Sequence, residues 1–165
     1  FLKKINILFK KNKVNKIYNA LCLGKFNKNK IIESMIKNKE KENKIIDNKK
    51  KAVTIFKTIE IFNECSLLEI IPLSGINHQI RIHSKCIGNP IANDIKYGNK
   101  DFNKKIRSLG LKRMFLHCKS LEFFCPIEKK RIKIKASYDD SLNKIVSVLK
   151  NNYILKNGKY NEKTN

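Results

Sequence analysis

The stretch "SGINHQIRIHSKCIGNPIANDIKYG", residues 74–98, concentrates the chemically distinctive side chains of this chain. It holds two of the three histidines and one of the four arginines in a sequence dominated by Lys, Asn and Ile. Asn77 suits a helix N-cap and Gly88 suits the position after a helix end, so we expect a short helix over residues 77–87. Pro90 then directs the chain into an extended or turning path.

Three interpretations of this helix compete. A metal site could use its histidines and Cys86, but residues on a helix are rotated by about 100° each. His78 and His83 therefore point about 140° apart and cannot share an ion, whereas His83 and Cys86 could. A second interpretation is a helix that packs Ile80 and Ile87 inward and leaves its other residues in solvent. The third is a polar site where a helix meets a sheet, with the arginine placed to meet an acidic group.

The rest of the chain predicts strand pairs mixed with short helices. Apolar spacing predicts a helix over residues 1–12 and a strand within residues 14–26 that ends near Gly24. Alternating apolar residues predict an antiparallel pair within residues 52–73 and a hairpin around the turn "CPIEKK" (125–130). Further expectations are one short strand in a mobile excursion at 27–51, a last helix from Asp140 or Ser141, and a loose polar tail beyond Asn151.

These elements define the expected fold class. It is an α+β domain with a mixed, largely antiparallel sheet and short flanking helices. We expect residues 1–150 to form this domain and residues 151–165 to form the polar C-terminal tail.

The amino-acid composition restricts the possible functions of the chain only broadly. A length of 165 residues suits one domain, and 41% apolar residues exclude a disordered chain. Five cysteines, with no CxxC pair, argue for a reducing, cytoplasmic setting. A net charge of +23 favours a nucleic-acid partner. However, all but four of the 37 basic residues are lysines, so drift in an A/T-rich genome explains the charge as well. No apolar run is long enough to cross a membrane.

The stretch 74–98 resembles the third signature of the RluA-type pseudouridine synthases, G-R-T-H-Q-[IL]-R-x-H followed by G-H-P-I and G-D-x-x-Y-G. The matching positions run from Gly75 through His78, Gln79, Ile80, Arg81 and His83, and then through Gly88, Pro90, Ile91, Asp94, Tyr97 and Gly98. "VNKIYNALCLG" (14–24) is similar to the family's K-x-Y-x-A-x-x-x-G strand, and residues 113–136 are similar to its closing hairpin. The resemblance covers about residues 3–136.

The resemblance implies the isomerisation of uridine to pseudouridine in structured RNA, with ribosomal RNA as the expected substrate and without cofactor or metal. It assigns Arg81 and Tyr18 to the catalytic site. Arg81 would hold a catalytic aspartate ionised, and the ring of Tyr18 would pack against a flipped uracil. Ile80 and Leu121 would line the pocket, while His78 and Gln79 would support the loop or a phosphate. Taken alone, each of these residues could equally be an ordinary surface or core side chain.

One departure from the family pattern stands out. The first signature, roughly H-R-L-D-x-x-T-S-G, carries the catalytic aspartate, and nothing in the chain matches it. Asp94 belongs to another motif and is not a substitute. Because the chain also lacks a starting Met, we expect a fragment, incomplete at its N-terminus, that is inactive by itself. A non-catalytic basic RNA-binding remnant and a ribosome-associated protein are the alternatives, and a cytoplasmic monomer is expected in each case.

Overall fold

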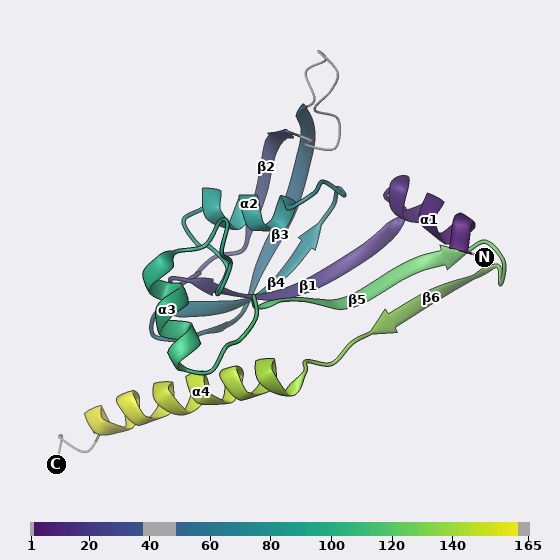
Figure 1. Ribbon diagram of the computed structural model, residues 1–165. Helices are drawn as coiled ribbons and strands as arrows, with labels where there is room; N and C mark the ends of the chain where they lie inside the picture. The colour runs from purple at the N-terminus through teal and green to yellow at the C-terminus, as the bar shows by residue number, and fades with distance from the viewer. Residues whose placement is uncertain (1, 38–48, 162–165) are drawn as a thin grey trace.

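The computed structural model describes residues 2–37 and 49–161, which form one sheet and four helices (Figure 1). The helices are α1 (Leu2–Lys10), α2 (Gln79–Cys86), α3 (Lys100–Ser108) and α4 (Asp140–Asn161). The strands are β1 (Val14–Leu23), β2 (Lys30–Lys37), β3 (Lys49–Ile61), β4 (Cys65–Pro72), β5 (Leu116–Cys125) and β6 (Lys130–Lys135).

All six strands belong to a single sheet with the order β2-β3-β4-β1-β5-β6. Every neighbouring pair in this part of the chain is antiparallel. The predicted α+β class is therefore confirmed. β1 lies in the interior of the sheet and pairs with β4 on one side and with β5 on the other.

Two apolar clusters cover the two faces of the sheet. Because side chains alternate along a strand, Leu21 of β1 enters one cluster while Ala20 and Cys22 enter the other. The first cluster packs against α3 and α4 and contains Ile145, and the second packs against Ile80 of α2. Figure 1 shows α2 over the β2–β4 part of the sheet and α4 along the opposite side.

Several local predictions are confirmed. The helix at the N-terminus, the strand ending before Gly24, the antiparallel pair β3–β4, the hairpin β5–β6 and the last helix are all present. α2 occupies most of the predicted range 77–87, and Gly88 follows it with a φ of 77°. It packs on β3 and β4 and reaches the edge strand β2 through His83 and Ser34. Within the described residues, no helix is long and apolar enough to span a membrane.

Other local predictions are wrong. Asn77 does not cap α2, because the N-cap position belongs to His78, whose φ is 57° and whose side chain caps nothing. The one short strand expected within residues 27–51 is present as β2, but Lys49–Lys51 already belong to β3, and the part of the expected excursion at 38–48 lies outside the described residues. The tail expected to be loose beyond Asn151 is helical to Asn161. α3, which we did not predict, is capped by the side chain of Asn99.

We expect Ile145→Ala to lower the free energy of unfolding by about 2–5 kcal/mol, because the substitution leaves a cavity where α4 meets the sheet. Ile145 is fully buried. Ile95→Ala is the matched control, since the Ile95 side chain is 89% exposed and its loss should cost less than about 0.5 kcal/mol. Urea unfolding followed by circular dichroism measures both, and equal effects would show that α4 is not part of the core.

Candidate functional site

Gln79 fixes the start of α2 by bonding to the sheet and to the preceding turn. Its side-chain oxygen accepts hydrogen bonds from the Ser74 hydroxyl (2.8 Å) and the Ile76 N–H (3.2 Å). Its side-chain amide donates to the Val53 carbonyl and to the Thr54 hydroxyl, both at 2.9 Å. The residue is buried, and its amide is fully used in these internal bonds. Of the two roles expected for Gln79, supporting the loop or a phosphate, these bonds favour the first.

His83 ties the middle of α2 to two strands. The ring is fully buried, with Nδ1 2.8 Å from the Thr54 hydroxyl and Nε2 2.7 Å from the Ser34 hydroxyl. A hydroxyl lies at each ring nitrogen, so a neutral ring donates to one hydroxyl and accepts from the other. Burial lowers the pKa of His83, which favours this neutral form.

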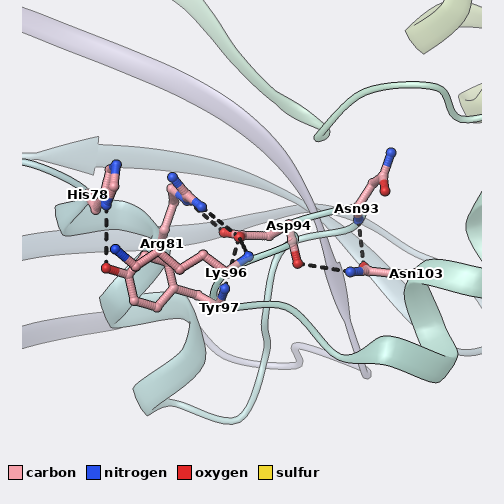
Figure 2. A network of polar contacts seen from close by, with 7 residues as sticks. All are labelled: His78, Arg81, Asn93, Asp94, Lys96, Tyr97 and Asn103. Carbon is pink, nitrogen blue, oxygen red and sulfur yellow. Dashed lines mark hydrogen bonds and ion pairs between the residues drawn. The ribbon is translucent and has the colours of Figure 1, made fainter.

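Arg81, on the same helix, forms a two-pronged ion pair with Asp94. Its Nε and Nη2 atoms each donate to one carboxylate oxygen at 2.7 Å (Figure 2). The arginine side chain is 18% exposed and the aspartate side chain is completely buried. Of the three interpretations of this helix, the ion pair favours the polar site with an arginine that meets an acidic group, and that group is Asp94.

Asp94 is held ionised by more than the arginine. Burial alone would raise the pKa of this carboxyl, but the hydrogen bonds from Arg81 and from the backbone N–H groups of Tyr97 and Lys96 lower it overall. Both N–H groups donate to the same oxygen at 2.9 Å. The pairing in turn raises the pKa of Arg81. Asp94 is therefore a permanent anion whose oxygens are already occupied.

The guanidinium of Arg81 also stacks on an aromatic ring. Its central carbon lies 5.0 Å from the centre of the Tyr97 ring, a cation–π contact. The ring of His78 meets the same tyrosine edge-on, and its Nδ1 lies 3.3 Å from the tyrosine hydroxyl. Among the described residues, no hydrogen bond uses the Nη1 group of Arg81. One edge of the guanidinium is thus fixed internally, and its Nη1 group can still meet a second acidic group.

The turn that carries Asp94 requires a left-handed backbone conformation at one residue and leaves no space for a side chain at another. Asn93 adopts a φ of 58°, a left-handed conformation that asparagine tolerates better than most residues, so it can replace the glycine of the family pattern. A side chain at Gly98 would meet the Asp94 carbonyl oxygen at 2.1 Å, so only glycine fits there. Asn103 of α3 completes the turn by donating to that same carbonyl at 2.8 Å. Helix α3 therefore stabilises the carboxylate that holds Arg81.

Tyr18 lies on the α2 side of the sheet. Its ring packs against the apolar cluster to which Ile80 belongs, and Cys118 is its partner on β5. Burial, reinforced by the neighbouring Cys118 thiol, raises the pKa of Tyr18 and keeps its hydroxyl protonated at neutral pH. Tyr18 and the helix that carries Arg81 thus share one face of the sheet. Within the part of the chain that the structure describes, no hydrogen bond or ring contact joins Tyr18 to Arg81.

Leu121 lies across from Lys16, two positions along β1 from Tyr18. It is half-buried on β5 and is not a member of the apolar cluster that joins Tyr18 to Ile80. The described side chains therefore bring together Tyr18 with Ile80, and Arg81 with His78 through Tyr97. A single pocket lined by all six predicted residues is not formed by these contacts.

A pocket of about 290 Å³ opens where β1 and β4 separate. The two strands are paired from Leu23 to Tyr18, whereas Val14–Ile17 pair only with β5 and Ile71 and Pro72 pair only with β3. The pocket is lined by both diverging segments and by residues of β5 and β6. Its lining begins at Ile17, next to Tyr18, but includes none of the six predicted site residues.

Two contributors to the site were missed by reasoning from the sequence. Asp94 was excluded as a catalytic substitute, and its role as the partner of Arg81 was not foreseen, although it belongs to the same motif. Tyr97 also belongs to that motif, but its contact with Arg81 depends on how the turn folds back. No group of three or more potential metal ligands occurs among residues 2–37 and 49–161.

Comparison with known proteins identifies the family. A sequence profile described as RNA pseudouridylate synthase matches residues 1–85, just over half of the chain. The ribosomal large subunit pseudouridine synthase C of Vibrio vulnificus is 32% identical over 152 residues, which cover 90% of this chain and 48% of that protein. Its Haemophilus influenzae counterpart is 39% identical over 101 residues, which cover 61% and 31%. The chain therefore belongs to the RNA pseudouridylate synthase family.

Solved structures agree with this fold. Human RNA pseudouridylate synthase domain containing 1 superposes with a TM-score of 0.65 at 21% identity, covering 88% of this chain and 69% of that one. Human RNA pseudouridylate synthase domain containing 4 gives 0.67 at 20% identity, covering 87% and 66%. The resemblance drawn from residues 74–98 is confirmed at the level of the family. The chain spans about half the length, or less, of the curated relatives cited above.

The buried His83 predicts a pH-dependent stability. Below its ordinary pKa of 6.5 the unfolded chain binds a proton at this ring, whereas the folded protein does so only at lower pH. Stability is therefore lost as the pH falls. We expect the difference in unfolding free energy between the wild type and His83→Gln to shrink by about 1 kcal/mol from pH 7.5 to 5.5. Urea unfolding at both pH values measures it, and a constant difference would contradict a buried neutral histidine.

Proposed function

We propose that this protein takes part in the isomerisation of uridine to pseudouridine in structured RNA, with ribosomal RNA as the substrate. The observation that carries the proposal is Arg81, held by the buried Asp94 on a helix that matches the family signature. The printed names of the relatives, ribosomal large subunit pseudouridine synthases, support ribosomal RNA as the substrate.

The reaction breaks the bond between N1 of uracil and C1′ of the ribose, turns the base, and forms a bond between C5 and C1′. The proton on C5 is then lost and N1 gains one, so atoms balance without a cofactor or metal. The base must leave its stack to be reached. In our proposal Tyr18 packs its ring against the extruded uracil, Ile80 and Leu121 supply apolar surface nearby, and His78 and Gln79 hold the loop around Arg81.

This scheme still needs a carboxylate to act as the catalytic acidic group. Asp94 cannot serve easily, because both of its oxygens bond to Arg81 and one also accepts two backbone N–H groups. We propose that the catalytic carboxylate comes from a segment that carries the H-R-L-D signature and meets the Nη1 side of Arg81. The Nε and Nη2 groups of Arg81 already bond to Asp94, so the catalytic aspartate would contact the Nη1 group.

A second candidate function is RNA binding without catalysis. The net charge of +23 favours it, and it needs only the basic surface. For either function we propose a cytoplasmic monomer. The five cysteines are all free, as a reducing compartment requires.

Release of tritium from C5-labelled uridine in RNA tests the catalytic proposal. Residues 1–165 alone should release none. A fusion that supplies the H-R-L-D segment ahead of residue 1 should be active, and Arg81→Ala in that fusion should lower the rate by several powers of ten. Arg81→Lys should restore the rate only in part, because a lysine ammonium lacks the planar guanidinium that can bond to two acidic groups at once.

Arg113→Ala is the matched control for these variants. Arg113 is also paired with an aspartate, Asp139, but the pair is exposed and lies away from the motif. It should leave the rate unchanged. Full activity of the Arg81→Ala fusion would refute the site, and turnover by residues 1–165 alone would return Asp94 to consideration as the acid.

RNA affinity should depend steeply on salt, because lysines that neutralise phosphates release counterions. Filter binding of a structured ribosomal RNA fragment at 50 and 200 mM salt measures this. Several phosphate contacts predict a loss of affinity of roughly a hundredfold or more over that interval. A flat response would mean that the lysines are solvated and do not bind RNA.

A further inference from the structure

Lys16 is an unusual lysine for this surface. The residue is only 9% exposed, although it carries an ammonium group at the middle of the sheet. Its one hydrogen bond is to the side-chain oxygen of Asn12 at 3.2 Å. No carboxylate lies within ion-pair distance among the described residues, and Lys16 is not among the residues with further contacts. A buried cation without an anionic partner is costly, so such lysines are rare outside functional sites.

The position of Lys16 is set by the separation of β1 from β4. It lies two residues before Tyr18, in the segment of β1 that has lost its pairing with β4, and it lines the pocket there. Asn12 bridges the mouth of the gap, because its amide donates to the Leu73 carbonyl at 2.6 Å while its oxygen accepts from Lys16. The ammonium end also lies close to Gly75, 3.6 Å from where a Cβ atom would stand at that position.

The charges around Lys16 leave it unneutralised. Glu122 lines the same pocket but is already paired with Arg131 at 3.2 Å and with Lys133 at 4.0 Å. Burial lowers the pKa of Lys16, and the nearby Cys118 opposes this only in part, because burial raises the pKa of that thiol and keeps it neutral. An ammonium has three N–H donors, and Asn12 takes one. Two donors therefore remain for a ligand that enters the pocket.

We propose that this pocket is a phosphate subsite, in which Lys16 binds a phosphodiester group of the RNA next to the nucleotide at Tyr18. The inference rests on the proposed function. A phosphate suits the site because it is an anion with several acceptor oxygens, and Lys is a common point-charge ligand for it. The net charge of +23 favours a polyanion over a single carboxylate from another protein segment.

Uridine 5′-monophosphate and uridine are the probes that test this subsite, since they differ only in the phosphate. NMR titration of the wild-type chain should show the nucleotide binding about tenfold more tightly than the nucleoside. Lys16→Met should remove that difference and leave the binding of uridine unchanged. Lys133→Met is the matched control, because Lys133 lines the same pocket but is exposed and pairs with Glu122. It should keep the tenfold preference.

Lys16→Arg keeps the charge and should keep most of the preference, which covers the case in which the methionine variant fails to fold. Equal or absent binding of the two probes to the wild type overturns the proposal, as does an unchanged preference in Lys16→Met. Either result would also be expected if an acidic protein segment occupied the pocket. Loss of preference in Lys16→Met together with no tritium release by the completed protein would retain the phosphate site and reject the isomerase function.

Discussion

The pairing of β1 with both β4 and β5 is the constraint on which the rest of the structure depends. Because β1 lies inside the sheet, its alternating side chains feed both apolar clusters, with Leu21 on the α4 side and Ala20 on the α2 side. The pairing with β4 stops at Tyr18, and the pocket begins where it stops. The topology of the sheet therefore places a buried lysine at this opening, two positions along β1 from Tyr18.

Hydrogen bonds between buried polar groups fix α2, and with it Arg81, on the sheet. Gln79 and His83 converge on the hydroxyl of Thr54, so α2 cannot shift on the sheet without leaving donors or acceptors unpaired. Each such loss costs about 1–3 kcal/mol. Arg81 projects from the same helix, and Asp94 holds its guanidinium from a turn that only glycine at position 98 permits. The orientation of the arginine thus follows from the satisfaction of buried hydrogen bonds.

Patterns among neighbouring residues predicted those helices and strands that depend on neighbouring residues. Alternating apolar residues identified β3 and β4, and Gly88 correctly ended α2. The predicted cap at Asn77 failed because the buried amide of Gln79 organises the preceding turn in place of a capping side chain. The strand at 30–37 was underestimated, because its Lys- and Asn-rich surroundings hide a pairing with β3 that is a long-range contact.

The sequence by itself determined the family, the short helix with its arginine, and the strand with Tyr18, because these depend on residue types at fixed spacings. Only the tertiary structure decided that Asp94 holds Arg81, that Ser34 meets His83 across 49 positions, and that Lys16 is buried with no carboxylate of the described residues beside it. Periodicity and motifs are properties of neighbouring residues. Desolvation and ion pairing depend instead on which distant segments the folded sheet brings together, and a one-dimensional pattern does not contain that information.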